Sequence, residues 1–345
     1  MLIAGRPGVG KSAVMKHLAA RVQRESCVLV LRRGRIIPGG WTAMAHTIGW
    51  AGSQVELFNE LGAGGGAIVF VDNIDQIDDQ GEWATVTDLL SQATRSRGWR
   101  VVATCGVESD DWKAKLPARV RTAGISGLVV GALSNEEKAE LSSQNGALAL
   151  ILTDSHPAKG IAENLFYLSR MVELGVGEVA GIATELDLAR LWWRYGGGRS
   201  EDDRRFARLK VLRALCAQVI SNPSQAIFNV DSLDSTTAAE LLRLESLREE
   251  TKGASVTFRH DVLRDWTIGF QLHEDASLLA AQSMERPLPA VLARGLEIAA
   301  RLALADDPTG QRWLALLAIV EREGSHGSWK RPVLLALPRS EDALT

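Results

Sequence analysis

The stretch Gly5-Arg6-Pro7-Gly8-Val9-Gly10-Lys11-Ser12 decides the fold of this chain of 345 residues. It fits the pattern G-x-x-x-x-G-K-[ST], in which a glycine-rich turn lies between a strand and a helix. A short apolar run, residues 1–4, precedes it, and a helix with its apolar face at Val14, Leu18 and Val22 is expected to follow. Strand, loop and helix together predict a phosphate-binding loop, rather than a glycine turn that happens to precede a lysine.

The residue types of this octet suit an anion and a metal ion. Glycine at positions 5, 8 and 10 lets the backbone curl so that its N–H groups point inward at a phosphate. The helix that begins near Lys11 adds its positive end, Lys11 reaches the terminal phosphates, and the Ser12 hydroxyl completes the octahedral shell of Mg²⁺. We therefore predict ATP or ADP with Mg²⁺ as ligands. The residues predicted to bind the nucleotide here are Gly5, Gly8, Val9, Gly10, Lys11, Ser12 and Ala13.

A carboxylate for the metal is predicted at the end of a second strand. Residues 67–71 are apolar throughout, as expected of a strand buried on both faces of a parallel sheet. Asp72 follows at the carboxyl edge, where open α/β sheets bind ligands, and we expect it on a strand neighbouring the first, holding Mg²⁺ through water. Asp75 and Lys11 are the predicted catalytic residues, Asp75 by orienting or deprotonating the attacking water. The alternative is that Asp75 and Asp78 are turn or helix-capping carboxylates.

A third strand, residues 101–104, ends in a threonine with two alternative roles. Thr104 contacts the γ-phosphate or is simply the buried end of a strand, and the sequence leaves both readings open. Cys105, next to it, is expected to be a small buried residue and not a nucleophile, because no histidine lies near it in the sequence.

Composition limits the classes of protein that this sequence fits. Its net charge of −3 gives no overall attraction to nucleic acid or to acidic membranes. Its three cysteines, far apart, make neither a disulfide framework nor a metal site, which favours a reducing, cytoplasmic setting. The loop begins at residue 5, which leaves no room for a signal peptide. Charges at Arg294, Glu297 and Arg301 interrupt the apolar stretch 289–304, so no membrane span is expected.

Both ends of the sequence suggest that it belongs to a longer protein. Only four residues precede Gly5, although a central strand normally has about five or six. Residues 339–345 come directly after a helical pattern and carry no obvious cap. We therefore expect a fragment, or a misplaced start.

The order of strand and helix signals predicts an α/β fold that is followed by helical parts. Through residues 1–131 strands and helices alternate, which indicates a parallel P-loop NTPase sheet covered by helices. From Ser134, a helix start, the pattern is helical, and we predict a helical lid domain at residues 132–198 with an amphipathic helix at 164–176. Residues 196–200, Gly-Gly-Gly-Arg-Ser, are the expected linker.

Two further domains are predicted after the lid. A winged-helix domain is expected at residues 199–275, from helices, a hairpin and a helix in that order. The elements that suggest it are helices at 206–220 and 235–247, an alternating strand at 255–259 and a helix from Asp261. Residues 276–345 resemble the start of a helical repeat region of the HEAT or TPR type, although no period can be demonstrated. The helices expected there lie at 288–304, 311–322 and 330–337.

Three motifs give the chain a resemblance to the signal-transduction ATPases with numerous domains, the STAND class that includes NACHT and NB-ARC proteins. The first is the octet, and the second is Asp-Asn-Ile-Asp at 72–75, in which a second acid follows the metal aspartate by three residues. The third is Phe-Arg-His-Asp at 258–261, similar to the Met-His-Asp motif of the family's winged helix, with Arg259 in place of Met. FRHDVLRDW, residues 258–266, also looks like bacterial members of the class, several of which act in antiphage defence.

The resemblance implies roles that composition and spacing leave open. In that family the winged-helix histidine contacts the β-phosphate of bound ADP and locks the resting state, and here that role falls on His260. By itself, a histidine before an acidic helix start reads as a surface or helix-capping residue, which is the alternative. This chain departs from the family at two places. It has Cys105-Gly106 where the family often has an arginine, and Leu165 where the family usually has a proline that lies against the adenine. These departures imply slow hydrolysis and leave the base preference open.

The leading hypothesis is a nucleotide-controlled signalling switch that binds ATP, hydrolyses it slowly and forms a homo-oligomer when an unknown protein trigger activates it. One alternative is an AAA+-like remodelling ATPase with sustained turnover, which requires an arginine finger from a neighbouring subunit. The other is a winged-helix DNA-binding regulator. Residues 204–275 contain ten Lys or Arg and ten Asp or Glu, so no basic footprint shows and specific nucleic acid is not an expected partner.

Overall fold

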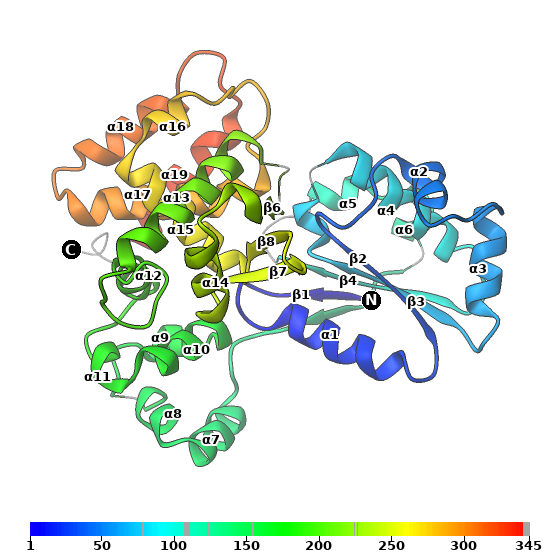
Figure 1. Cartoon of the computed structure of the whole chain (residues 1–345), viewed down its shortest axis with the longest axis horizontal. Coiled ribbons are helices and arrows are strands. Elements are labelled where there is room, and N and C mark those ends of the chain that lie inside the picture. The colour runs from blue at the N-terminus through cyan, green and yellow to red at the C-terminus, as the bar shows by residue number, and fades with distance from the viewer. Residues whose placement is uncertain are drawn as a thin grey trace. The chain divides into compact units, whose positions relative to one another are not determined.

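The computed structural model divides the chain into two compact units, Met1–Ala132 and Leu133–Thr345. The structure describes residues 1–77, 79–106, 111–122, 124–153, 155–223, 225 and 227–340. In Figure 1 the first unit runs from blue to blue-green and the second from green to red. The predicted fold class is confirmed: a parallel α/β sheet of the P-loop NTPase kind comes first, and a mainly helical region with a winged-helix arrangement follows.

Unit 1 alternates strands and helices along the chain. Each strand carries the chain to the carboxyl edge of the sheet and the helices return it, which is the geometry that parallel pairing requires. Its elements are β1 (Leu2–Ala4), α1 (Lys11–Val22), β2 (Cys27–Arg32), α2 (Gly40–Thr47), α3 (Gln54–Gly62), β3 (Ala67–Asp72), the 3-10 turn η1 (Ile74–Gln76), α4 (Gln80–Ala93), β4 (Trp99–Cys105), α5 (Asp111–Lys115), α6 (Ala118–Thr122) and β5 (Gly127–Val129).

The strands of unit 1 pair in parallel in the order β2-β3-β4-β1-β5. This corrects one expectation: the strand that ends at Asp72 does not neighbour the strand of the phosphate loop, because β4 lies between β3 and β1. Ile3 pairs with Thr104, and Phe70 pairs with Val102, which sets the register across that intervening strand. Parallel strands all end at one edge, so Asp72 still comes within reach of the loop across the end of β4.

The strand β3 is buried on both faces, as its continuous apolar sequence predicts. Val69 and Val71 belong to a core cluster that also holds side chains of α2, α3 and α4, whereas Phe70 belongs to a second cluster with Ile3 and Met15. Successive side chains of a strand point to opposite faces, so helices cover both sides of the sheet.

The buried face of α1 differs from the expected one. The sequence suggested Val14, Leu18 and Val22, but Val14 is 39% exposed, and Met15, at 5%, is buried in its place. The loop fixes where the helix starts, and Lys11 at its first position is itself buried, so the sheet-facing stripe runs through positions 11, 15 and 18. The expectation for Val14 is wrong because this residue lies about 100° around the helix from Met15.

Unit 2 is mainly helical and contains a small antiparallel sheet. Its elements are α7 (Asn135–Gln144), α8 (Gly146–Ile151), α9 (Lys159–Ala162), α10 (Leu165–Leu174), α11 (Val176–Val179), α12 (Glu185–Arg194), α13 (Arg205–Ser221), β6 (Phe228–Asn229), the 3-10 turn η2 (Val230–Ser232), α14 (Ser235–Arg243), β7 (Leu247–Thr251), β8 (Ser255–Phe258), α15 (Asp261–Glu274), α16 (Ser277–Ala280), α17 (Ala290–Asp306), α18 (Gln311–Val320), η3 (Gly327–Trp329) and α19 (Lys330–Arg339). One core cluster runs through these elements and includes the fully buried Trp266 of α15. The domain boundaries predicted within unit 2 stay predictions.

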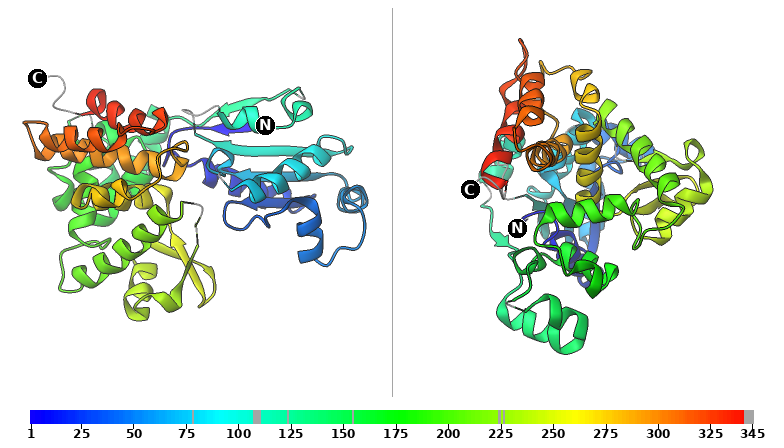
Figure 2. Two further views of the ribbon diagram at one scale, coloured as in Figure 1. Left: turned by 90° about the horizontal axis from the view of Figure 1, so that it is seen from above. Right: turned by 90° about the vertical axis from the view of Figure 1, so that its left-hand side faces the viewer.

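The sheet of unit 2 has the order β6-β8-β7, with antiparallel pairing. The hairpin of β7 and β8, yellow in Figure 2, was expected, whereas β6 was not. The helix α14 ends at Arg243 and not at the expected residue 247, because Leu247 begins β7 and pairs with Phe258. With α15 directly after β8, helices, hairpin and helix follow in the expected order.

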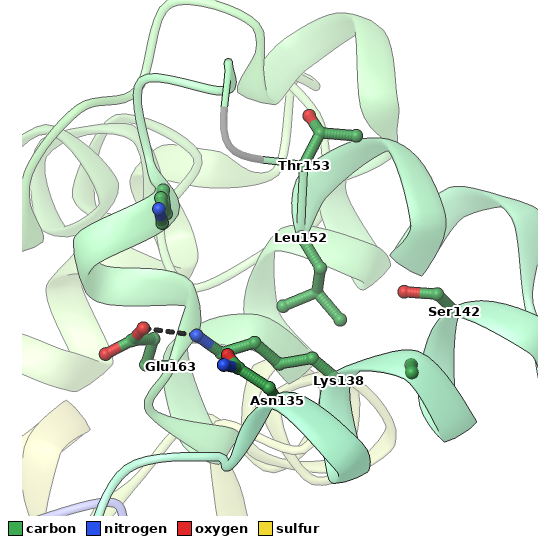
Figure 3. Close-up of a pocket in the computed structure, with 8 residues that line it drawn as sticks. Asn135, Lys138, Ser142, Leu152, Thr153 and Glu163 are labelled. Carbon is green, nitrogen blue, oxygen red and sulfur yellow. Dashed lines mark hydrogen bonds and ion pairs between the residues drawn. The ribbon is translucent and has the colours of Figure 1, made fainter.

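A cavity lies in the part of unit 2 formed by α7, α8 and α9. Its volume is about 510 Å³, and the ion pair of Lys138 with Glu163 lies at its wall (Figure 3). None of the residues predicted to bind nucleotide belongs to its lining. The lining consists of Asn135, Lys138, Ala139, Ser142, Leu152, Thr153, Lys159 and Glu163.

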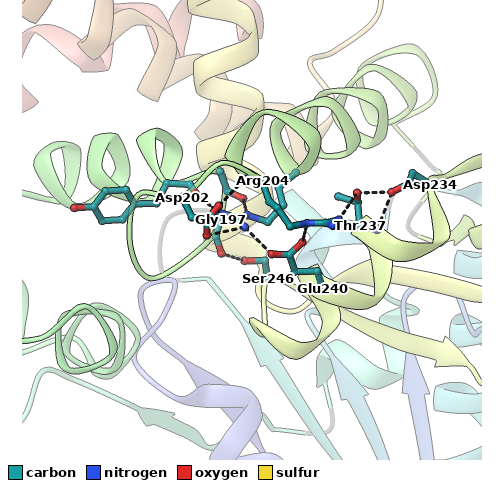
Figure 4. Close-up of polar contacts among 10 residues, drawn as sticks. Gly197, Asp202, Arg204, Asp234, Thr237, Glu240 and Ser246 are labelled. Carbon is teal, nitrogen blue, oxygen red and sulfur yellow. Dashed lines mark hydrogen bonds and ion pairs between the residues drawn. The ribbon is translucent and has the colours of Figure 1, made fainter.

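The expected linker at residues 196–200 begins as a packed turn and is not a flexible connection. Gly196 and Gly197 are buried, with φ of 60° and 76° in the left-handed region. The guanidinium of Arg208, a residue 0% exposed, donates from Nε to Gly196 O at 3.1 Å, and Ser246 Oγ donates to Gly197 O at 2.7 Å (Figure 4). The glycines therefore serve a tight turn and a close approach of neighbouring groups.

Gly196→Ala is expected to destabilise unit 2 by more than the loss of a left-handed glycine alone. A Cβ at Gly196 would lie 2.5 Å from Arg205 O, whereas a Cβ at Gly253, which has a similar φ of +69°, would meet nothing within 4 Å. Gly253→Ala is the matched control and should lower the free energy of unfolding by about 1–2 kcal/mol. Gly196→Ala should lower it by about 3 kcal/mol or more, because overpacking adds to the backbone strain. Urea unfolding followed by tryptophan fluorescence measures both, and equal losses would contradict the packed-turn interpretation.

Candidate nucleotide-binding site

The octet at residues 5–12 forms the connection between β1 and α1. Gly8 and Gly10 have φ of 83° and 99°, and Gly10, as the N-cap of α1, brings no side chain to occupy the first N–H groups of the helix. Gly5 lies so close to the chain after β5 that a Cβ there would stand 2.7 Å from Val130 O. Backbone N–H groups and the positive end of a helix thus come together, which is the arrangement that binds phosphate.

Lys11 is the buried cation of this loop. It is 8% exposed, and its Nζ donates to Gly5 O and to Arg6 O, each at 2.9 Å. Carbonyl oxygens are weaker partners for an ammonium than the charged oxygens of a phosphate. The side chain is therefore held within the loop where a terminal phosphate would replace those carbonyls. Its catalytic role stays a prediction.

One carboxylate oxygen joins the loop to the ends of two strands. Asp72 Oδ1 accepts from Ser12 Oγ at 2.9 Å and from Thr104 Oγ1 at 2.7 Å. Thr104 Oγ1 accepts in turn from the backbone N–H of Asn73 at 2.7 Å. Residues singled out in three separate stretches of sequence therefore meet in one hydrogen-bonded cluster.

The donor set of this cluster fits Mg²⁺. Hydroxyl and carboxylate oxygens are groups that Mg²⁺ takes as partners, directly or through a bound water. Ser12 Oγ and Asp72 Oδ1 supply one of each, and they are 2.9 Å apart. Among the residues that the structure describes, no group of three or more His, Cys, Asp or Glu could hold a metal ion. A magnesium ion at this place would therefore take most of its ligands from water and phosphate, as Mg²⁺ does in nucleotide sites.

Thr104 is completely buried, at 0% exposed. Its hydroxyl donates to Asp72 and accepts from Asn73, so Thr104 is a buried strand-end residue that orients the Asp72 carboxylate. Contact of Thr104 with a γ-phosphate stays a prediction. Cys105, at 3% exposed, is the buried small residue that was expected.

Asp75 lies in the 3-10 turn η1 that follows β3. Its Oδ2 accepts from the backbone N–H of Gly106 at 3.0 Å. Both acids of the run 72–75 are therefore bonded to the end of β4, Asp72 through Thr104 and Asp75 through Gly106. The sequence did not reveal this role of Gly106, because a backbone donor leaves no side-chain signal. Water activation by Asp75 stays a prediction.

The alternative for Asp75 and Asp78 was a helix-capping role, but the helix after β3 is capped by a different acid. Asp79 is the N-cap of α4, and its Oδ1 accepts from the N–H of Glu82 at 2.8 Å. Asp78 lies outside the described residues. Among the described residues no helix start has Asp75 as its N-cap, and the backbone N–H of Gly106 is one of the partners of its carboxylate.

His260 lies in unit 2 as the N-cap of α15. Its Nδ1 accepts from the backbone N–H of Val262 at 3.2 Å, which is the helix-capping role given above as the alternative. The imidazole also stacks on Phe166 of α10, with ring centroids 4.4 Å apart and planes at 30°. Contact of His260 with a β-phosphate stays a prediction. The sequence did not predict the contact of Phe166 with His260; it showed only an aromatic residue directly after Leu165.

Comparison with known proteins finds a similarity to one family for the first part of the chain. The profile of the family described as "ATPase family associated with various cellular activities (AAA)" matches residues 1–122. Residues 1–122 are therefore similar to the P-loop NTPase domains of the AAA family. No curated protein matches the chain.

Several solved structures are similar to the chain at low sequence identity. The Aeropyrum pernix ORC1 protein in complex with DNA is 17% identical, with a TM-score of 0.32, over 80% of this chain and 86% of that one. The Aeropyrum pernix ORC2 protein in its ADPNP–ADP complexes is 14% identical, with a TM-score of 0.35, over 80% and 88%. Cdc6p of Pyrobaculum aerophilum is 10% identical, with a TM-score of 0.34, over 79% and 87%. These likenesses do not single out the STAND class within the P-loop NTPases.

Two further observations concern the chain as a whole. The three cysteines, Cys27, Cys105 and Cys216, are free thiols, and Cys105 and Cys216 are buried. Within the described ranges, no helix combines the length and the apolar character that crossing a membrane requires.

Lys11→Ala is expected to abolish binding of ATP and ADP while the fold survives. The change removes the ammonium held among the loop carbonyls and leaves the strand contacts of the sheet in place. Lys16→Ala, on the exposed side of the same helix, is the matched control and should bind nucleotide like the wild type. Calorimetry measures the affinity, and circular dichroism reports the fold. Wild-type affinity in a folded Lys11→Ala protein would show that the octet is not the phosphate site.

Proposed function

We propose that the chain is a nucleotide-controlled signalling switch of the STAND type. It binds ATP or ADP with Mg²⁺ at the loop, hydrolyses ATP slowly with Asp75 and Lys11, and forms a homo-oligomer when a protein trigger activates it. The observation that carries the proposal is the hydrogen bond between Ser12 Oγ and Asp72 Oδ1, at 2.9 Å, which joins the phosphate loop to the metal acid. A role in bacterial antiphage defence belongs to the same proposal and rests on the sequence likeness of residues 258–266.

Slow hydrolysis is supported by the residues at the end of β4. Cys105 and Gly106 come where related switches often carry an arginine. In P-loop NTPases an arginine finger raises turnover by about 10³- to 10⁵-fold, because it stabilises the charge of the transition state. Lys11 alone among the proposed catalytic residues supplies positive charge here. Mg²⁺, when bound with the nucleotide, would neutralise part of the phosphate charge.

A cytoplasmic setting is part of the proposal. Three free thiols support it, because a reducing compartment keeps cysteines unpaired. The trigger is proposed to be a protein.

DNA binding is the second candidate function. The expectation that specific nucleic acid is not a partner finds no support in the comparisons, because one similar structure is a complex with DNA. Acidic and basic residues remain balanced in residues 204–275. Binding to duplex DNA that weakens with salt, and that is lost when the chain ends before Arg204, would favour this function. Rapid hydrolysis without any partner would favour a remodelling ATPase, whereas tightly co-purifying ADP would favour the switch.

Asp72→Asn and Asp75→Asn are expected to separate metal binding from hydrolysis. Asp72→Asn removes the charge that Ser12 and Thr104 face, and it should weaken Mg²⁺-dependent nucleotide affinity by about 10- to 100-fold. Asp75→Asn should leave affinity unchanged and slow hydrolysis by about 10²- to 10⁴-fold, because it removes only the group that acts on water. Asp79→Asn is the control, since asparagine caps a helix about as well as aspartate. Calorimetry and phosphate release measure the two effects. Unchanged turnover in both variants would place the catalytic acid elsewhere.

His260→Ala is expected to shift the protein toward its open, self-associating form. If His260 bonds the β-phosphate only in the resting state, its loss shifts the equilibrium between the resting and the open form by the full free energy of that contact. A hydrogen bond to a charged group is worth roughly 1.5–3 kcal/mol, so the closed-to-open ratio should fall by about ten- to a hundredfold. His326→Ala is the matched control, because its Nδ1 also accepts a backbone N–H, from Ser328 at 3.2 Å. Light scattering with ADP at equal concentrations reports size. If His260→Ala stays monomeric and releases ADP at the wild-type rate, His260 has only a structural role and the prediction is contradicted.

A further inference from the structure

The cavity of unit 2 is lined on one side by a polar stripe of α7. Positions i, i+3, i+4 and i+7 of a helix share one face, and in a helix that packs on its domain this face is normally apolar. The residues at these positions of α7 are Asn135, Lys138, Ala139 and Ser142. All four line the cavity of about 510 Å³. Every residue of α7 lies within the described ranges, and none of them is buried, so this face meets the cavity in place of a packed core.

Contacts of the backbone hold the walls of the cavity together. Glu163, the C-cap of α9, accepts at its carbonyl oxygen from the backbone N–H of Leu133 at 3.1 Å, directly before α7. The start of α7 is fixed by a capping box, in which the N–H of Ser134 donates to Glu137 Oε2 at 2.7 Å. These contacts do not involve the side chains that line the cavity. The cavity should therefore persist when the side chains on its wall exchange partners.

An ion pair crosses from one wall of the cavity to the other. Lys138 Nζ of α7 contacts Glu163 Oε1 at the end of α9, and the two side chains are 17% and 34% exposed (Figure 3). An ammonium has three N–H donors and a carboxylate has two acceptor oxygens, whereas this contact uses one of each. The pair therefore presents both a positive and a negative group to a ligand.

A ligand that carries both charges suits such a pair best. A singly charged ligand would compete for one member and leave the other without its partner, which is costly for a partly buried charge. In a free α-amino acid the ammonium and the carboxylate are attached to the same carbon, so they can face Glu163 and Lys138 at once. The Asn135 amide and the Ser142 hydroxyl offer further hydrogen bonds, and Leu152 offers apolar surface to a side chain.

We propose that this cavity binds a free α-amino acid, with its carboxylate on Lys138 and its ammonium on Glu163. Small-molecule sites have volumes of about 300–1,000 Å³, and this cavity lies within that range. None of its lining residues takes part in the proposed binding of nucleotide. The proposal therefore goes beyond the signalling switch and adds a second kind of ligand, held within unit 2 alone.

The first arm of the test is calorimetry on the full chain with glycine, L-serine and L-leucine. At least one of them should bind saturably at one site for each chain. Each is compared with the amine that lacks its carboxylate and with the acid that lacks its ammonium. These analogues are methylamine and acetate, ethanolamine and β-hydroxypropionate, and isoamylamine and isocaproate. The analogues of an amino acid that binds should bind at least about tenfold more weakly, because each loses a hydrogen bond between charged groups.

The second arm removes the two charges of the cavity one at a time. Lys138→Met and Glu163→Gln should each weaken binding of the amino acid by about 10- to 100-fold. Lys330→Met is the matched control, because Lys330 forms an ion pair with Glu321 at 3.2 Å in the same unit and does not line the cavity. It should bind like the wild type. Circular dichroism reports the fold of each variant.

Ala139→Trp tests the cavity without removing either charge. Ala139 is an exposed lining residue of α7, so an indole there should occupy the cavity and abolish binding while the helix remains. This variant also serves if Lys138→Met does not fold. Wild-type affinity in a folded Ala139→Trp protein would overturn the proposal.

The remaining outcomes separate this proposal from the proposed nucleotide site. Lys11→Ala should bind the amino acid like the wild type, since Lys11 belongs to unit 1 and the cavity to unit 2. Loss of amino-acid binding in Lys11→Ala would place the ligand at the phosphate loop and overturn the proposal. Absence of saturable binding for all three amino acids would overturn it as well, and so would equal affinity for a singly charged analogue. None of these results bears on whether the loop binds ATP.

Discussion

The hydrogen bond from Ser12 to Asp72 is the contact on which the rest of the candidate site depends. Ser12 belongs to the first turn of α1, and Asp72 is the last residue of β3, so the bond spans the end of β4, which lies between the two strands. Thr104, at that end of β4, donates to the same carboxylate oxygen. An ionised carboxylate that accepts two hydroxyl bonds is held in one orientation. The strand order therefore has a chemical consequence, because β4 between β3 and β1 brings Thr104 to the carboxylate of Asp72.

The sequence singled out the residues of this candidate site because they belong to short contiguous motifs. The octet and Asp72 are recognisable from the apolar runs beside them. The strand order was missed, since pairing is decided by the whole sheet and a motif carries no information on its neighbour. Val14 was misplaced because periodicity gives the spacing of a helical stripe, whereas the loop sets its phase. The packed turn at Gly196 and Gly197 was not foreseen, because composition does not separate a flexible glycine from one required by a tight turn.

Unit 2 shows why domain boundaries are harder to predict than elements. Glu185, in the predicted lid, is buried and accepts from Arg294 and Arg301 of the predicted repeat region and from Trp266 of the predicted winged helix. Burial acts to raise the pKa of Glu185, but Arg294 and Arg301 outweigh it and hold that pKa below its usual value. Removing one partner from such a group leaves an uncompensated buried charge, at a cost of about 3–5 kcal/mol. The three predicted domains therefore share polar contacts that neither local propensity nor periodicity encodes.

The capping role of His260 does not compete with a role in nucleotide binding. The sequence presents the two as alternatives because it treats the side chain as one group, but an imidazole has two distinct nitrogens. Nδ1 is used by the N–H of Val262, and this bond assigns the proton of the neutral ring to Nε2. Without the cap, either nitrogen of the neutral ring could carry that proton. The helix start is thus the condition under which an uncharged histidine presents a donor of fixed direction, and the stack on Phe166 fixes the plane in which it points.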